Sequence, residues 1–210
     1  MIAYRTLAEK IAHIVEQWIW EEQLHPGQPI REREIAQQLQ VSQTPVREAF
    51  RILEARGLLV HAPHKGTTVV NLTENDIRQI LAVRFPLEVL ALQLAREHRT
   101  PTDCTQLERL FQRLVEASQN DDLSAYHEAH MAFHQCIWHL SRNRFLADTL
   151  IRLNAPLWAF YRKRLRQGHR RPLHGKIEKH QQVLDFVLGR CPPEWTAEAV
   201  MQAHFRDVHS

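Results

Sequence analysis

The sequence has little glycine and cysteine, and it has no apolar stretch long enough to cross a membrane. It contains only six glycines in 210 residues, and strand-forming runs are also scarce, which favours a mostly helical chain. The three cysteines are widely spaced and form no Cys-x-x-Cys pair, which argues against a disulfide scaffold or a thiolate zinc site. Because a membrane span needs roughly 18 apolar residues, we expect no membrane anchor, no signal peptide and a cytoplasmic location.

Net charge says little about the partners of this chain. The formal net charge is +3, and residues 1–71 contain eight Lys and Arg against eight Asp and Glu. A nucleic-acid interaction would therefore depend on where the charges lie and not on their excess.

The N-terminal region predicts three helices. Apolar residues recur at three- and four-residue spacing across residues 4–22, as in a helix with one buried face. Two shorter helices are expected over 31–40 and 44–57. Either Ser42 or Thr44 is the expected N-cap of the third helix, since both can accept a hydrogen bond from a free backbone amide.

The third helix is followed by a predicted β-hairpin. Gly57 is placed to end the helix in a left-handed conformation. Segments 58–63 and 67–70 are short, apolar and β-branched, and the sequence His-Lys-Gly joins them. Three helices and a hairpin describe a winged helix-turn-helix, which we assign to residues 1–71.

The rest of the chain predicts helices alone. A linker is expected over residues 72–76, with Thr73 as the N-cap of the next helix and Asp76 three residues later. The expected helices cover about 74–98, 101–119, 121–140, 143–166, 174–189 and 195–208. The predicted fold class is therefore mostly α, with an N-terminal winged helix-turn-helix followed by an all-α helical bundle over residues 77–210.

The third helix carries polar side chains where a DNA-reading helix needs them. The second helix of a helix-turn-helix enters the major groove, and its N-terminal residues reach the base edges. The DNA contacts expected at this helix end, at the start of the preceding helix and at the hairpin tip are Arg33, Ser42, Gln43, Thr44, Arg47, Lys65 and Gly66. In the alternative, Arg47 and Arg51 pair with glutamates of their own helix on a solvated face.

Four histidines on the later helices are candidates for metal ligands. His130 and His134 are four residues apart, so they project from one face of a helix. His180 and His204 are each a single histidine among apolar residues of a later helix. If the four converge, they form a site for a divalent metal with coordination positions left for water or a ligand. In the alternative, each is a hydrogen-bonded core residue.

The segment "LHPGQPIREREIAQQLQVSQTPVREAFRILEARGLLVHAPHKGTTVV" resembles the winged-helix domain of the GntR superfamily of bacterial transcription regulators. The resemblance implies a homodimer that binds a palindromic operator of double-stranded DNA. The positions that the family uses for DNA contacts are here Arg33, Ser42, Gln43, Thr44, Arg47 and Gly66. The family usually has Arg where this chain has Gln43. Because Arg prefers guanine and Gln prefers adenine, we expect the operator to differ from the common family sequence at that base pair.

Residues 74–208 resemble the FCD ligand-binding domain of the FadR branch of that superfamily, in its shorter, six-helix VanR-type form. The motifs "VRFPLE" and "AFHQCIWHLSRN" and the two late histidines carry the resemblance. It implies a divalent metal in the bundle and a small organic-acid effector, with Arg84 and Asn143 as effector-binding residues. For Arg84, an internal ion pair with Glu88, four residues later, is the alternative.

One metal-site position departs from the family pattern. Metal-binding relatives usually have Asp where this chain has His130. Imidazole in place of a carboxylate favours zinc, nickel or copper over manganese, and it leaves positive charge that favours an anionic effector. Alternatively, the change has destroyed the site. His127 and His139 match no ligand position of the family, and we expect neither to bind the metal.

These features together predict a ligand-responsive transcription regulator. Effector binding would change the placement of two winged helices in a dimer, so that the protein is released from its operator, as a repressor is, or repositioned on it. No nucleophile and base occur at a recognisable spacing, so we expect no enzyme. The rival is a histidine-rich metalloenzyme or metal store whose winged helix binds proteins. Paired Glu-x-x-His motifs would support it, but the sequence has none.

Overall fold

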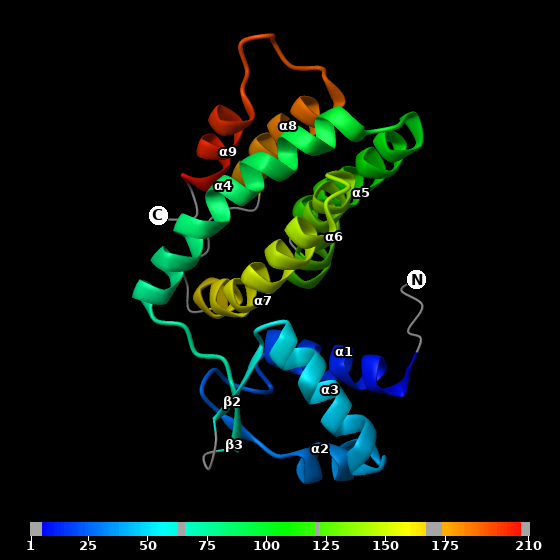
Figure 1. Cartoon of the computed structure of the whole chain (residues 1–210), viewed down its shortest axis with the longest axis vertical. Helices are drawn as coiled ribbons and strands as arrows, with labels where there is room; N and C mark the ends of the chain where they lie inside the picture. The colour runs from blue at the N-terminus through cyan, green and yellow to red at the C-terminus, as the bar shows by residue number, and fades with distance from the viewer. Residues whose placement is uncertain (1–5, 63–65, 121, 167–173, 207–210) are drawn as a thin grey trace. The chain divides into compact units, whose positions relative to one another are not determined.

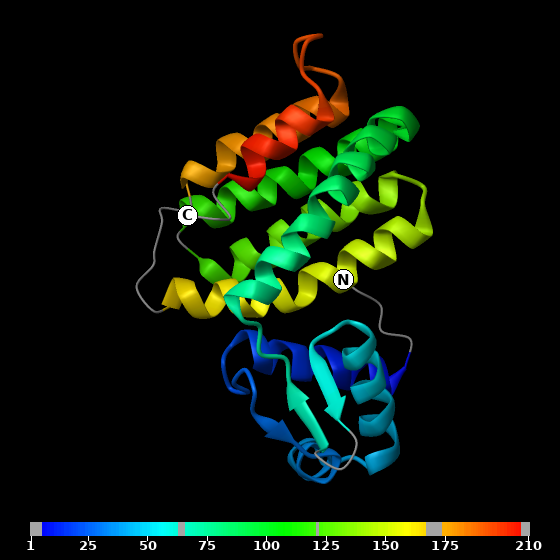
Figure 2. The same cartoon turned by 60° about the vertical axis from the view of Figure 1, so that its left-hand side comes forward.

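The computed structural model describes residues 6–62, 66–120, 122–166 and 174–206 (Figures 1 and 2). Contacts between residues divide the chain into two compact units. The first contains the described residues of 1–78 and 152–170, and the second those of 79–151 and 171–210. Among the described residues, no helix is both long and apolar enough to cross a membrane.

The described part of the first unit begins as a winged helix-turn-helix. Its elements are α1 (Leu7–Trp20), β1 (Pro29–Ile30), α2 (Glu32–Leu39), α3 (Gln43–Ala55), β2 (Leu59–Ala62) and β3 (Gly66–Val69). Strand β3 lies between β1 and β2 and is antiparallel to both. The predicted helices and hairpin are confirmed. Strand β1 was not predicted, because two residues, one of them proline, are too few to show a strand pattern.

The ends of α3 follow from its sequence. Ser42 is the N-cap residue by its extended backbone, although its side chain does not make the expected capping hydrogen bond, and Thr44, the other candidate, lies inside the helix. At the other end Gly57 has a φ of +75°, a conformation that costs glycine little and other residues more. The amide of Leu58 donates to the carbonyl oxygen of Leu53 at 2.9 Å, which completes a Schellman-type ending.

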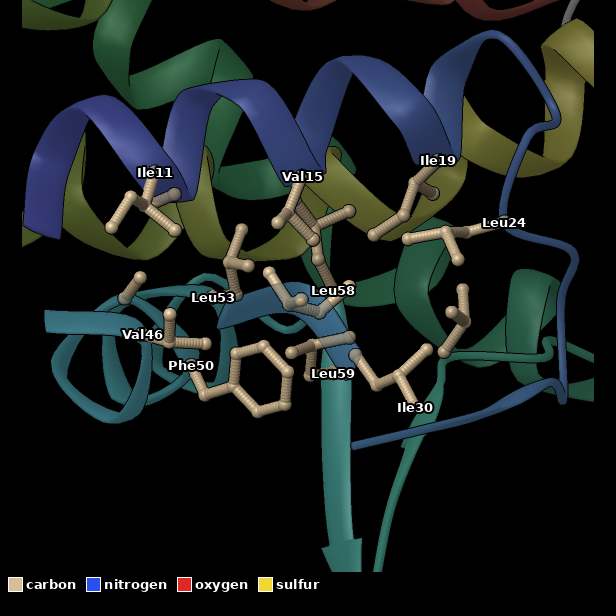
Figure 3. Close-up of a cluster of buried hydrophobic side chains, with 14 of the residues drawn as sticks. Ile11, Val15, Ile19, Leu24, Ile30, Val46, Phe50, Leu53, Leu58 and Leu59 are labelled. Carbon is tan, nitrogen blue, oxygen red and sulfur yellow. The ribbon is translucent and has the colours of Figure 1, made fainter. Parts of the chain in front are cut away.

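A buried apolar core fixes the orientation of α3 (Figure 3). The buried residues labelled in the figure are Ile11, Val15, Ile19, Leu24, Ile30, Val46, Phe50, Leu53, Leu58 and Leu59. Three of them, Val46, Phe50 and Leu53, follow each other on α3 at four- and three-residue spacing, so they occupy one face of that helix. With this face buried, the polar residues of the opposite face must point to solvent.

The helices of the second half have nearly the predicted bounds. They are α4 (Glu74–His98), α5 (Pro101–Gln119), α6 (Leu123–Leu140), α7 (Arg144–Arg166), α8 (His174–Leu188) and α9 (Ala197–Phe205). Helix α7 contributes residues to both units, which divide it at Arg152. The amide of Thr73 donates to the Asp76 carboxylate at 2.8 Å, and the Asp76 amide donates to the Thr73 hydroxyl. The predicted capping pair is therefore present, and α4 begins inside the segment predicted as a linker.

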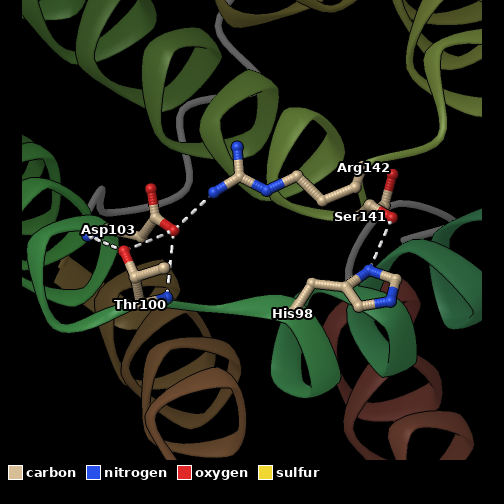
Figure 4. A network of polar contacts seen from close by, with 5 residues as sticks. All are labelled: His98, Thr100, Asp103, Ser141 and Arg142. Carbon is tan, nitrogen blue, oxygen red and sulfur yellow. Dashed lines mark hydrogen bonds and ion pairs between the residues drawn. The ribbon is translucent and has the colours of Figure 1, made fainter.

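A polar network ties the start of α5 to the end of α6 (Figure 4). Thr100 and Asp103 cap α5 by reciprocal hydrogen bonds, and Arg142 donates to the same Asp103 oxygen at 2.7 Å. Burial raises the pKa of the Asp103 carboxyl, but the bonds from Thr100 and the charge of Arg142 outweigh it and lower that pKa overall. Nearby, Nδ1 of His98 lies 3.0 Å from the Ser141 carbonyl oxygen. These contacts hold the C-terminal end of α6, the helix that carries two of the candidate metal ligands.

Candidate nucleic-acid interface and candidate metal centre

The described residues predicted to contact DNA are all exposed. They are Arg33 in the first turn of α2, Ser42, Gln43, Thr44 and Arg47 at the N-terminal end of α3, and Gly66 at the start of β3. Gly66 has a φ of +81°, and a Cβ added there would meet nothing within 4 Å. Among the described residues no neighbour requires the glycine, which therefore serves the backbone conformation. Lys65 lies outside the described residues.

Arg47 forms an ion pair that its sequence neighbours did not suggest. Its Nε donates to both carboxylate oxygens of Glu32, at 3.1 and 3.3 Å. Glu32 is the first residue of α2, so this pair joins the two helices of the helix-turn-helix. The alternative of a pair within α3 is therefore wrong for Arg47, whose partner lies fifteen residues earlier in the chain.

In the second unit, four buried histidines come together from three helices. His130 and His134 lie on α6, His180 on α8 and His204 on α9. Each offers one ring nitrogen, and these four atoms all lie within 4.8 Å of one another. The Nε2 atoms of His134 and His180 are 3.3 Å apart. Nitrogens bound tetrahedrally to zinc at about 2.1 Å lie roughly 3.4 Å apart, so His134 and His180 already have the spacing of two ligands of one ion, and the group of four could hold one.

Burial keeps the imidazoles of His130 and His134 neutral. It lowers the pKa of His130 well below 6.5, and the neighbouring imidazoles of the cluster and His127 lower that pKa further. Burial also lowers the pKa of His134, helped by His204, His180 and Arg84. Because a metal binds the neutral imidazole, these two residues need lose no proton at neutral pH to act as ligands.

A buried ion pair lies beside the histidines. The Nε and Nη2 atoms of Arg84 are 3.0 and 2.9 Å from Oε1 of Glu88. The indole nitrogen of Trp138, on α6, donates to the other Glu88 oxygen at 2.8 Å. The guanidinium of Arg84 also lies over the ring of Phe205, the residue that follows His204 on α9. The structure thus contains the internal pair expected as the alternative for Arg84, and the contacts between these two described residues use Nε and Nη2 of the guanidinium.

Sequence reasoning missed two aromatic residues near this site. Trp138 follows His134 by one helical turn, and Tyr126 precedes His130 by one turn, so the spacing could have placed both on the site's face of α6. The rings of Tyr126 and His130 have their centroids 5.8 Å apart. Burial raises the pKa of the Tyr126 phenol, and its hydroxyl has no hydrogen-bond partner among the described residues. Such a hydroxyl is available to a bound molecule.

The structure does not bring Asn143 to the four histidines. Asn143 is exposed, and its Oδ1 accepts a hydrogen bond from the Leu146 amide at 3.1 Å, which caps the start of α7. His139 is also exposed, as expected for a residue off the ligand face of α6. His127 is buried and one turn from the ligand pair, but it does not belong to the group of four.

Two family matches cover most of the chain. Residues 79–207 match the FCD domain, and residues 7–69 match the bacterial regulatory proteins of the gntR family. The first match spans the second unit's helices and all four clustered histidines. The second spans the winged helix-turn-helix and every described residue predicted to contact DNA.

Relatives of known name are regulators. The chain is 35% identical, over 141 residues, to a probable D-xylose utilization operon transcriptional repressor of Paenarthrobacter nicotinovorans. The matched region covers 67% of this chain and 62% of that protein. It is 32% identical, over 130 residues, to the HTH-type transcriptional regulator McbR of Escherichia coli. That match covers 62% of this chain and 59% of McbR. The chain thus spans about three fifths of the length of these relatives.

Solved structures share the fold over nearly the whole chain. The structure of E. coli McbR/YncC matches with a TM-score of 0.80 at 24% identity, over 98% of each chain. A putative transcriptional regulator GntR from Rhodococcus sp. RHA1 matches with a TM-score of 0.68 at 20% identity, over 96% of this chain and 94% of the other. At these identities the matches show the fold alone.

Proposed function

Because the chain belongs to the gntR family of bacterial regulatory proteins and carries an FCD domain, we propose that it is a transcription regulator that binds a palindromic operator as a homodimer. The exposed polar end of α3, held on a buried core, is the observation that carries this proposal. The families that match are regulators and not enzymes, in line with the lack of a catalytic motif in the sequence.

The DNA contacts divide by type. Gln43, Thr44 and Arg47 lie at the end of α3 that would enter the major groove, where their side chains would meet base edges. Arg33 and Gly66 would meet phosphates or the minor groove, which fixes the position of the protein without reading sequence. A two-fold dimer presents two copies of α3, which is why a palindromic operator is expected.

The second part of the proposal is a divalent metal, zinc or nickel, held by His130, His134, His180 and His204. Four nitrogen donors favour these metals over manganese, which prefers oxygen. When bound, the ion would supply positive charge and an open coordination position. The chain itself adds little net charge here, because the lowered pKa values of His130 and His134 keep these two imidazoles neutral and Arg84 is compensated by Glu88. The site would therefore favour an anionic effector.

The proposed effector is a small carboxylate. Arg84 could donate to it through Nη1 while Nε and Nη2 stay on Glu88. Asn143 was predicted from the family motif to contact the effector, but its cap on α7 gives it a different role in the structure. The effector would release or reposition the dimer only if it has a higher affinity for one conformation of the dimer, with one placement of the winged helices, than for another.

Retardation of the DNA upstream of the protein's own gene, with and without a chelator, tests the proposal. We expect a retarded complex that unrelated DNA does not displace at equal concentration. Retardation equal to that of unrelated DNA would contradict it, since electrostatic binding alone does not discriminate between sequences.

The residue at position 43 is expected to set one base of the operator. Gln pairs best with adenine N6 and N7, whereas Arg pairs with guanine O6 and N7. We expect Gln43→Arg to change the selected base from adenine to guanine at one position of each half-site, with a preference of about tenfold. Selection from a random DNA pool by the two proteins measures this, and identical selected sequences would contradict it.

Metal-free protein is expected to lose stability as the pH falls below about 6.5. Burial lowers the pKa of His130 and His134 in the folded state, so below 6.5 the unfolded chain binds more protons. The contribution of His130 and His134 to the free energy of unfolding is complete above their pKa in the unfolded chain. It is lost as the pH falls from that value towards their lower pKa in the folded protein. Thermal unfolding in chelator between pH 8 and 5 measures it. A His134→Gln variant should show a shallower dependence, and equal dependence would contradict the prediction.

A further inference from the structure

Glu32 holds one side of the Arg47 guanidinium. The two carboxylate oxygens lie 3.1 and 3.3 Å from Nε of Arg47. The Arg47 side chain is 57% exposed and that of Glu32 is 30% exposed. The contact joins the first turn of α2 to the helix proposed to enter the major groove. It therefore acts on Arg47 at the surface where DNA would bind.

The side of the guanidinium that Glu32 occupies matters for base reading. Arginine has five N–H donors in a planar fork, and the Nη1 and Nη2 atoms form the edge that can meet guanine O6 and N7 together. Glu32 takes Nε, so it leaves this edge available. Because an exposed arginine has many rotamers, a partner that fixes its plane reduces the ordering needed when DNA binds.

The charge of Glu32 matters for phosphate binding. A free arginine beside DNA is attracted to any phosphate, and this attraction is independent of sequence. A carboxylate about 3 Å from Nε weakens that attraction by partly neutralising the arginine. It also repels phosphates itself, so it disfavours placements in which Arg47 contacts the backbone in place of a base.

We propose that Glu32 is a positioning residue that makes Arg47 read a base and keeps it from binding phosphates without selection. This inference rests on the proposed function of α3 as the DNA-reading helix. Glu32 would then mainly determine the ratio between the affinities for operator DNA and for unrelated DNA. It would have a smaller effect on the affinity for the operator alone.

The same helix offers a matched control. Arg31, the N-cap residue of α2, and Glu34 in its first turn form an ion pair at 3.1 Å, with side chains 78% and 59% exposed. Removing the Glu34 carboxylate changes the charge of α2 as much as removing that of Glu32, but it leaves the partner of Arg47 in place. Both variants are expected to fold, because exposed ion pairs add little to stability; thermal unfolding checks this.

The test measures dissociation constants over a range of salt concentrations. The probes are a DNA duplex selected from a random pool by the wild type and a scrambled duplex of equal length. For Glu32→Ala we expect the affinity ratio between the two duplexes to fall about tenfold, with tighter binding to the scrambled duplex. Glu34→Ala should keep the wild-type ratio. Glu32→Gln, whose amide oxygen can still accept from Nε, should keep most of it.

A double variant separates positioning from a general charge effect. In an Arg47→Ala background, Glu32→Ala should leave the ratio unchanged, because no guanidinium remains to be positioned. The proposal is overturned if Glu32→Ala keeps the wild-type ratio, if Glu34→Ala lowers it equally, or if the effect persists without Arg47. If the wild type selects no sequence at all, the proposed function fails and this inference fails with it.

Discussion

Replacing His134 with alanine is expected to abolish stoichiometric metal binding. His134 is 2% exposed, and its Nε2 lies 3.3 Å from that of His180. Loss of a group that only supports a ligand typically weakens metal binding by about 10- to 100-fold. Loss of a ligand should exceed that, so we expect a weakening of more than about a hundredfold. Elemental analysis of protein purified without a histidine tag measures it, because the wild type should retain one zinc or nickel per chain.

His139→Ala is the matched control, since His139 lies on the same helix but is exposed. It should bind metal as the wild type does. Because a buried alanine leaves a cavity, the His134→Gln variant provides a second measurement in which the side-chain volume is better kept. Unchanged occupancy in both His134 variants, or no metal in the wild type, would show that the four histidines are core residues and that His130 marks a lost site.

Replacing Arg47 with alanine is expected to remove most of the sequence preference of DNA binding. A bidentate arginine contact is worth about 2 kcal/mol, and a dimer makes two of them. The loss for the operator is therefore about 4 kcal/mol, or roughly a thousandfold in the dissociation constant. Affinity for unrelated DNA should change far less. Titration of the wild type and the variant with operator and scrambled duplexes measures both quantities.

Arg51→Ala is the control for this variant. Arg51 is exposed on α3, one turn further from the N-terminal end than Arg47. Its removal changes the charge of α3 as much as removal of Arg47 does. Arg51→Ala should therefore weaken binding to the operator and to the scrambled duplex by similar factors, each smaller than the loss that Arg47→Ala causes for the operator. Equal effects of the two substitutions on the affinity ratio would contradict the assignment of Arg47 to base reading.

The sequence predicted the fold well because each helix carries its own signals. Thr73 and Asp76 cap α4, and Gly57 ends α3, as their positions indicated. Such signals depend on residues close together in the chain, where spacing determines contact. Strand β1 was missed because its pairing with β3 is long-range and its two residues show no pattern.

The candidate sites divide in the same way. His130 and His134 share a helix face, so four-residue spacing placed them together. The position of His180 and His204 beside them depends on how α8 and α9 pack in the bundle. The family resemblance implied this position, but residue spacing alone did not establish it. The Glu32 partner of Arg47 was missed because its contact crosses from α2 to α3.

The residue at position 130 would decide the character of the proposed metal site. An imidazole stands there, where the resemblance to the FCD domain implies a carboxylate, and its ring centroid lies 4.5 Å from those of both His134 and His180. It therefore points into the cluster and not away from it. This geometry favours a retuned, all-nitrogen site over a lost one, and it motivates the preference for zinc or nickel.

Selection of fragments from the genomic DNA of the source organism by the purified wild type tests the central claim most directly. We expect enrichment of a few fragments that share a two-fold symmetric sequence, with no such enrichment by Arg47→Ala. The genes beside these fragments would then suggest the identity of the proposed effector. Fragments without a common sequence, or the same fragments enriched by Arg47→Ala, would contradict the claim that α3 reads an operator.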